Sequence, residues 1–175
     1  APARPVDRIV LATDHARVVD AVAPFGGEAV LTGTDCRTGT DRVADAADRL
    51  KLPDTQVVVN VQGDEPEMTG ECVDRVVEML DTPDAEIATL ATAIAAEDAA
   101  ATQLTKVVFD RDGRAMYFSR ARIPHDRDGD AAPTYYLHHG IYGYRAGFVR
   151  AFARLDSTPA ERAEKLEQLR AIEHG

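Results

Sequence analysis

The segment of the sequence most suited to chemistry is an acidic turn that follows a strongly apolar run. Residues 57–61 read Val-Val-Val-Asn-Val, and residues 62–66 read Gln-Gly-Asp-Glu-Pro. A carboxylate such as Asp64, just beyond a buried strand, stands where ligands bind in open α/β sheets. It suits a hard cation such as Mg2+, and Gly63 allows a ligand to approach closely. The pattern leaves open the alternative of a loop acid that caps the next turn.

A second candidate segment is Thr38-Gly39-Thr40-Asp41-Arg42, ahead of a helical pattern. Hydroxyls and backbone N–H groups at a helix start can bind a phosphate or the edge of a base. The plainer interpretation is a helix cap made by Thr40 or Asp41.

The second half of the chain offers three polar features. Arg120 follows an expected strand and is either a clamp for a carboxylate or a solvated arginine. His138 and His139 are adjacent on an expected strand, so they point to opposite faces, which disfavours a metal site made by both. The helical periodicity around residues 167–168 (Glu-Gln) predicts, by itself, no more than an ordinary exposed helix face.

In the first half of the chain, strands and helices in alternation must hold these residues in place. The hydrophobic pattern predicts a strand, then a helix, three times over, at residues 8–13, 15–25, 28–32, 41–50, 57–61 and 70–80. Such alternation predicts a parallel sheet with helices on its faces.

The second half predicts further strands and a hairpin. Residues 106–109 and 115–118 flank Asp110-Arg111-Asp112-Gly113, a hairpin signal. We also expect strands at 87–94 and 140–144, a long loop at 123–133, and helices at 146–154 and 159–172. With no internal repeat or clear linker, we expect a single α/β domain over residues 1–175 with a mixed sheet.

Composition excludes several classes of protein. Of the 175 residues, 45% are hydrophobic, enough for a core. The net charge of −10 argues against a nucleic-acid-binding protein, which needs a basic face, and we expect no nucleic-acid partner. No apolar run approaches the roughly 20 residues that span a membrane, so we expect no membrane association. The sequence has no Gly-x-Ser-x-Gly elbow, Walker loop or Gly-x-Gly-x-x-Gly motif. This argues against an α/β hydrolase, a P-loop protein and a Rossmann dehydrogenase, respectively.

Taken together, several segments resemble the 3-deoxy-manno-octulosonate cytidylyltransferase (CMP-Kdo synthetase) family. They occur in the family's order at residues 8–15, 38–42, 58–66, 106–108, 117–124, 139–145 and 166–170. The combination of Asn-Val-Gln-Gly-Asp-Glu-Pro and Gly-Ile-Tyr-Gly-Tyr-Arg is specific. The resemblance implies a three-layer Rossmann-like nucleotidyltransferase (nucleotide-diphospho-sugar transferase) fold with a mixed, mostly parallel sheet.

The resemblance also implies roles for individual residues. Asp64 is expected to bind Mg2+, the expected cofactor, with Gln62 beside it contacting substrate. The loop residues Thr38, Gly39, Thr40 and Arg42 are expected to recognise the cytidine of CTP. The positions expected to hold the sugar acid are Arg120, His138, Tyr142, Glu167 and Gln168.

The implied activity is transfer of CMP from CTP to 3-deoxy-D-manno-octulosonate (Kdo), for lipopolysaccharide synthesis in the cytoplasm, by a homodimer. Alternatives are a cytidylyltransferase for sialic acid or an amino-Kdo analogue, and a non-catalytic nucleotide-sugar-binding domain. The family's N-terminal Arg-rich, Gly-Lys-containing loop and its C-terminal segment with a second Mg2+ aspartate have no counterpart here. We therefore expect a domain truncated at both ends, and a 175-residue chain that is catalytically incomplete by itself.

Overall fold

The computed structural model of the chain describes residues 6–65 and 67–175. The described residues divide into two compact units, the first formed by residues 6–65, 67–88 and 141–154 and the second by residues 89–140 and 155–175. Strands β4 (Ile87–Ile94) and β7 (Tyr135–Arg145) have residues in both units and pair with each other. The expected single domain over the whole chain stays a prediction.

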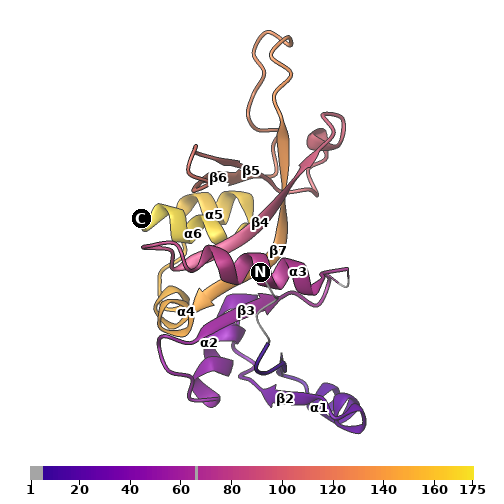
Figure 1. Cartoon of the computed structure of the whole chain (residues 1–175), viewed down its shortest axis with the longest axis vertical. Helices are drawn as coiled ribbons and strands as arrows, with labels where there is room; N and C mark the ends of the chain where they lie inside the picture. The colour runs from indigo at the N-terminus through magenta and orange to yellow at the C-terminus, as the bar shows by residue number, and fades with distance from the viewer. Residues whose placement is uncertain (1–5, 66) are drawn as a thin grey trace. The chain divides into compact units, whose positions relative to one another are not determined.

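The first unit begins with a β-α-β arrangement. Strand β1 (Val10–Thr13) pairs in parallel with β2 (Glu28–Leu31). Between them lie helix α1 (Ala16–Val22) and the 3-10 turn η1 (Ala23–Phe25), and α1 packs beside β2 (Figure 1). The expected alternation of strand and helix is confirmed for this part of the chain.

Two further helices and an antiparallel strand pair complete the first unit. The helices are α2 (Gly39–Arg49) and α3 (Gly70–Met79). Strand β3 (Val57–Val61) pairs with the second half of β7, from Val57↔Arg145 to Val61↔Ile141. Helix α4 (Ala146–Ala153) continues directly from β7 and packs against α2. The apolar core here includes Ala44, Tyr142, Tyr144 and Val149.

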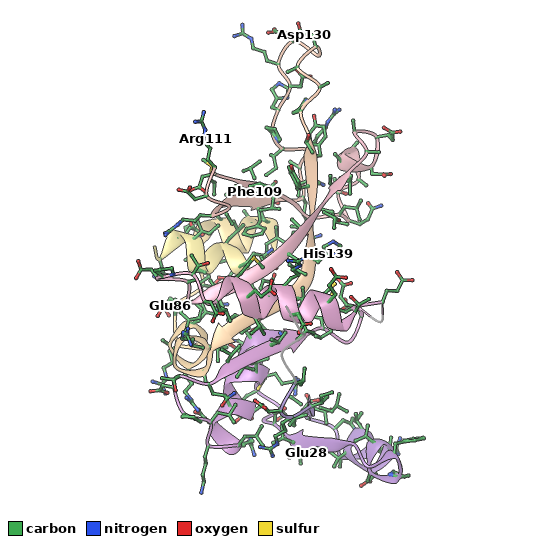
Figure 2. The ribbon with its side chains drawn as sticks, viewed as in Figure 1. Glu28, Glu86, Phe109, Arg111, Asp130 and His139 are labelled. Carbon is green, nitrogen blue, oxygen red and sulfur yellow. The ribbon has the colours of Figure 1, made fainter. Side chains whose placement is uncertain are left out.

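The second unit is built on the expected hairpin. Strands β5 (Lys106–Phe109) and β6 (Ala115–Ser119) pair antiparallel, and Asp110 Oδ1 accepts hydrogen bonds from the backbone of the turn (Figure 2 labels Phe109 and Arg111). Strand β5 also pairs with β7, at Lys106↔Leu137. The 3-10 turn η2 (Asp98–Ala100) precedes β5, and the expected long loop separates β6 from β7.

Two short helices close the second unit. These are α5 (Pro159–Glu164) and α6 (Gln168–Glu173), and α6 packs against β6 (Figure 1). The core between them and the hairpin contains Val107, Phe118, Leu166 and Leu169.

Three details differ from the sequence-based expectations. The sheet is mixed, as expected, and the β5–β6 hairpin is antiparallel, as expected, but the β3–β7 and β5–β7 pairs also run antiparallel where mostly parallel neighbours were expected. Strand β7 begins at Tyr135 rather than at residue 140. The single helix expected over 159–172 is broken at Lys165, whose φ of 55° is left-handed.

The helix break has a geometric consequence. In one continuous helix, two residues nine positions apart would project from opposite sides of the axis, because each residue advances by about 100°. Glu161 and Arg170 are nine positions apart, and their side chains form a buried ion pair. The break at Lys165 therefore allows a contact that an unbroken helix would prevent.

Candidate active site

The start of α2 is held by its own cap. Thr38 is the N-cap residue, and its side chain accepts a hydrogen bond from Asp41 N at 3.1 Å. The cap is thus made by Thr38 rather than by Thr40 or Asp41. A Cβ placed on Gly39 would lie 3.7 Å from Asn60 Nδ2, so the first turn of α2 approaches the end of β3. The two segments expected to bind nucleotide and metal therefore adjoin within the first unit.

Thr40 is directed into the core. It is buried, and its Oγ1 lies 3.4 Å from the hydroxyl of Tyr144. Its side chain thus contributes to packing. If Thr40 contacts cytidine, it does so through its backbone groups.

Arg42 joins the ends of the first two strands. Its Nη1 donates to Thr32 Oγ1 at 2.6 Å, and its Nη2 donates to Asp14 Oδ2 at 3.2 Å. The hydrogen bond from Arg42 lowers the pKa of the Asp14 carboxyl, since it favours the charged form. Because Asp14 and Thr32 directly follow β1 and β2, this guanidinium fixes the carboxyl ends of both strands against α2.

The turn after β3 carries exposed oxygen donors. Gln62, Gly63 and Asp64 are all exposed, and Glu65 N donates to Gln62 O at 3.1 Å to form the turn. Pro66, the last residue of this motif, lies outside the described residues. Across residues 6–65 and 67–175, no group of three or more His, Cys, Asp or Glu side chains is arranged to hold a metal ion. Asp64 thus offers a single accessible carboxylate.

Tyr142 lies on β7 opposite Asn60 of β3. It is 8% exposed and stacks on Tyr144, with the ring centroids 6.0 Å apart. The residues expected at the site that lie in the first unit are Thr38, Gly39, Thr40, Arg42, Gln62, Asp64 and Tyr142.

Arg120 lies in the second unit and is not a solvated side chain. Its Nε donates to the carbonyl of Glu164 at 2.9 Å, and its backbone N–H donates to Glu164 Oε2 at 3.0 Å. Its carbonyl accepts a hydrogen bond from Lys106 Nζ at 2.6 Å. Neither Lys106 nor Glu164 belongs to the site residues expected from the sequence. The one available signal was a lysine at the start of the apolar strand pattern at residues 106–109.

His138 is half-buried and uncharged at neutral pH. Its Nε2 lies 3.0 Å from Thr89 Oγ1, and its ring meets Phe118 edge-on at 4.9 Å. Burial lowers its pKa from 6.5 to about 4, since the charged imidazolium is poorly solvated there. At neutral pH, His138 is therefore a hydrogen-bonding group and not a cation.

His139, labelled in Figure 2, has a separate partner. Its Nε2 lies 2.9 Å from Thr92 Oγ1, whereas His138 contacts Thr89. The two adjacent imidazoles thus use different threonines of β4, as expected for neighbours that face opposite sides of a strand.

The Glu167-Gln168 pair is less exposed than its sequence pattern indicated. Gln168 is buried at the start of α6, and Glu167 is half-buried, with its Oε1 3.9 Å from Arg170 Nη2. The interpretation as an ordinary exposed helix face was wrong, because the break at Lys165 turns this segment toward the core of its unit. The site residues in the second unit are Arg120, His138, Glu167 and Gln168.

A cavity of about 350 Å³ in the first unit involves other residues. Charged side chains from α2, α4 and their flanking residues line it, including Asp41, Asp48 and Arg150. Arg150 is held there by Asp48 and Asp54, at 2.6 and 2.7 Å. Of the candidate segment at residues 38–42, Asp41 lines this cavity, whereas Thr38, Gly39, Thr40 and Arg42 do not.

The sequence and the fold are those of a cytidylyltransferase. The protein-family model for cytidylyltransferases matches residues 3–175 of the chain. A solved CMP:2-keto-3-deoxy-manno-octonic acid synthetase in complex with CTP matches 99% of this chain and 71% of its own, with a TM-score of 0.91 and 36% identity. A 4-diphosphocytidyl-2C-methyl-D-erythritol synthase shares the fold, with a TM-score of 0.54 and 15% identity. The expected α/β nucleotidyltransferase fold is confirmed.

The curated relatives of the chain belong to one family within this class. A 3-deoxy-manno-octulosonate cytidylyltransferase of Halorhodospira halophila is 51% identical, over 96% of this chain and 69% of its own length. One from Desulfatibacillum aliphaticivorans is 47% identical, over 100% of this chain and 72% of its own length. The chain belongs to the family of 3-deoxy-manno-octulosonate cytidylyltransferases.

No helix in the part of the chain that the structure describes is long and apolar enough to cross a membrane.

Proposed function

We propose that this protein transfers CMP from CTP to Kdo and releases pyrophosphate, so that it supplies activated CMP-Kdo. The observation that carries this proposal is the match, over 99% of the chain, to a synthetase of this substrate class solved with CTP. The names of relatives at 51% and 47% identity support the same reaction.

The proposed chemistry is a substitution at phosphorus. The anomeric hydroxyl oxygen of Kdo forms a bond to the α-phosphorus of CTP, its proton is released, and the bond from that phosphorus to pyrophosphate breaks. Both substrates are anions, so the protein must hold them in line and offset their repulsion. Little covalent chemistry is required of its side chains.

On the nucleotide side, we assign cytidine recognition to the loop at the start of α2. Thr38 and Gly39 are accessible there, and the buried Thr40 contributes backbone groups. Arg42 holds the loop against the ends of β1 and β2 through Thr32 and Asp14. Its role is thus to shape the loop as well as to supply positive charge.

On the sugar side, we assign the carboxylate of Kdo to Arg120, because a guanidinium binds a carboxylate through two parallel hydrogen bonds. His138, neutral at pH 7 because of its lowered pKa, is suited to a sugar hydroxyl. Tyr142, Glu167 and Gln168 are assigned to the remaining hydroxyl groups. Selectivity for an acid over a neutral sugar then depends chiefly on Arg120.

We also propose that the reaction uses Mg2+. Asp64 would hold the ion, with Gln62 beside it, and this exposed single carboxylate fits a cation that retains waters and completes its shell with substrate phosphates. When bound, Mg2+ would offset the charge between the two anions and favour the nucleophilic oxyanion. Chelation is expected to abolish turnover, and adding Mg2+ is expected to restore it.

The resemblance further suggests a homodimer that acts in the cytoplasm to supply lipopolysaccharide synthesis. Exposed apolar side chains on the β5–β6 hairpin, Phe109 and Met116, are compatible with a partner surface. Light scattering of the full-length protein tests the dimer, and a monomer at micromolar concentration would contradict it.

Pyrophosphate release by the full-length protein tests the choice of substrates. CTP is offered with Kdo, an amino-Kdo analogue or a sialic acid, and Kdo is offered with each of the other nucleoside triphosphates. We expect release only with CTP and Kdo. Release with sialic acid alone would move the assignment to another sugar acid, and no release with any of them would favour a binding role.

A further inference from the structure

Arg120 is anchored at its backbone and at the inner nitrogen of its side chain. Its N–H donates to Glu164 Oε2 at 3.0 Å, its carbonyl accepts from Lys106 Nζ at 2.6 Å, and its Nε donates to the Glu164 carbonyl at 2.9 Å. By contrast, its Nη1 makes only a long contact of 3.5 Å with Thr102 O. Within residues 6–65 and 67–175, Nη2 donates to no protein acceptor. The outer edge of the guanidinium is thus the part left to bind a ligand.

Glu164 makes two of these three contacts through different groups. Its carboxylate accepts from Arg120 N and, at 2.5 Å, from the buried hydroxyl of Ser119. Its carbonyl belongs to the last residue of α5, where a helix leaves carbonyls without intrahelical partners. Since Lys165 next to it is left-handed, α5 ends here and this carbonyl is turned to Arg120 Nε.

Lys106 makes the third contact from a fully buried position. Its Nζ donates to the carbonyls of Ala101, Leu104 and Arg120, at 2.7, 2.5 and 2.6 Å. An ammonium has three donors, so its hydrogen-bonding capacity is filled by these carbonyls. It therefore fixes the 101–104 loop, which carries the Thr102 carbonyl, and the backbone of Arg120 together.

We propose that Glu164 and Lys106 are positioning residues that hold the Arg120 guanidinium ready for the carboxylate of the sugar acid. This inference rests on the proposed function. A long arginine side chain loses rotamer freedom when it binds a ligand, and affinity improves when that freedom has been removed beforehand. Binding geometry is also most accurate where supporting hydrogen bonds lock the contacting side chain.

The variant Glu164→Gln in the full-length protein tests the inference. The amide has one acceptor oxygen where the carboxylate had two, and its NH2 group would face a donor, either Ser119 Oγ or Arg120 N. We expect KM for Kdo to rise about tenfold, the effect of losing one charge-assisted hydrogen bond. We expect KM for CTP to change less than about twofold, because the affected contacts lie around Arg120.

A double-mutant cycle distinguishes positioning from a general structural role. If Glu164 acts through Arg120, Glu164→Gln changes KM for Kdo less than about twofold when Arg120→Lys is already present. The full tenfold increase in that background would overturn the inference. So would an equal loss for Kdo and CTP in the single variant.

Two further variants complete the design. Glu173→Gln is the control, since its carboxylate accepts from Ala160 N and not from Arg120, and KM for Kdo is expected to stay at the wild-type value. If Glu164→Gln fails to fold, Ser119→Ala removes one donor to Glu164 and is expected to raise KM for Kdo about threefold. An unchanged KM in Ser119→Ala would then overturn the inference. Failure of the proposed function is visible separately, as no turnover of Kdo by the wild type.

Discussion

The carboxylate of Glu161 binds the guanidinium of Arg170 through two hydrogen bonds, 3.0 Å from Nε and 2.6 Å from Nη2. Glu161 Oε2 also accepts from Thr158 N at 3.1 Å, which completes the cap of α5. The pair joins α5 to α6 on either side of the break at Lys165. It therefore holds the segment that carries Glu167 and Gln168.

Removing one partner of this buried pair is expected to be costly. Glu161→Gln should lower the free energy of unfolding by about 3–5 kcal/mol, because the buried guanidinium of Arg170 loses its bidentate carboxylate and keeps only the more distant one of Glu167, at 3.9 Å. Urea unfolding at pH 7 measures this. The control Glu78→Gln, in a surface pair with Arg75 in which both side chains are more than half exposed, should cost no more than about 1 kcal/mol. Equal effects of the two substitutions would contradict the structural role of Glu161.

The close approach of β7 to α3 predicts a second effect. A Cβ on Gly143 would lie 2.4 Å from Val76 Cγ1 and 3.0 Å from Leu80 Cδ1, both on fully buried side chains. Gly143→Ala should therefore destabilise the protein by about 1–3 kcal/mol. Gly70→Ala is the matched control, since nothing lies within 4 Å of its added Cβ at the start of α3. An unchanged melting temperature in Gly143→Ala would show that the contact is not tight.

The partial burial of His138 predicts a pH dependence of stability. Its pKa is lowered from 6.5 to about 4, so between these values the unfolded chain binds a proton that the folded protein excludes. The contribution of this group to stability is complete above pH 6.5 and is lost as the pH falls toward 4, by roughly 3 kcal/mol in all.

Unfolding free energies measured between pH 7 and 4 test this. His138→Gln should flatten the slope in that window, while His125→Gln, at an exposed position, should leave it unchanged. The carboxyl of Glu161 acts in a lower range, because the hydrogen bond from Arg170 lowers its pKa from 4.5 to about 2. Its contribution is present above pH 4.5 and is lost below it. A slope that persists between pH 6.5 and 4.5 in His138→Gln would contradict the assignment.

The helices, strands and turns that could be predicted from the sequence are those whose structure follows from the pattern of their own residues. The apolar run at 57–61 and the amphipathic patterns at 41–50 and 70–80 gave β3, α2 and α3 to within about two residues. The turn at Asp110 gave the β5–β6 hairpin in the same way. Each depends on local periodicity or turn chemistry, which a single sequence carries.

The rest depended on contacts between distant residues. Tyr135 to His139 lacks a clear alternation, so only pairing with β4 and β5 reveals where β7 begins. The break at Lys165 accompanies the pairing of Glu161 with Arg170, and no Gly or Pro at residues 163–167 announces it. The support that Lys106 and Glu164 give to Arg120 likewise joins segments 14 and 44 residues from it. No local pattern identifies such contacts.

The central claim, transfer of CMP to Kdo at a site that needs Asp64, is tested most directly by product analysis. Full-length wild type and Asp64→Asn are incubated with CTP, Kdo and Mg2+, and the products are followed by 31P NMR and mass spectrometry. We predict CMP-Kdo and pyrophosphate from the wild type, and at least a hundredfold less, on the order of the loss of an electrostatic catalytic group, from Asp64→Asn. Because Asp64 is exposed, its variant should melt at the wild-type temperature, as should the control Asp112→Asn in the exposed hairpin turn, which should also retain activity. Normal CMP-Kdo formation by Asp64→Asn, or its absence from the wild type, would contradict the account.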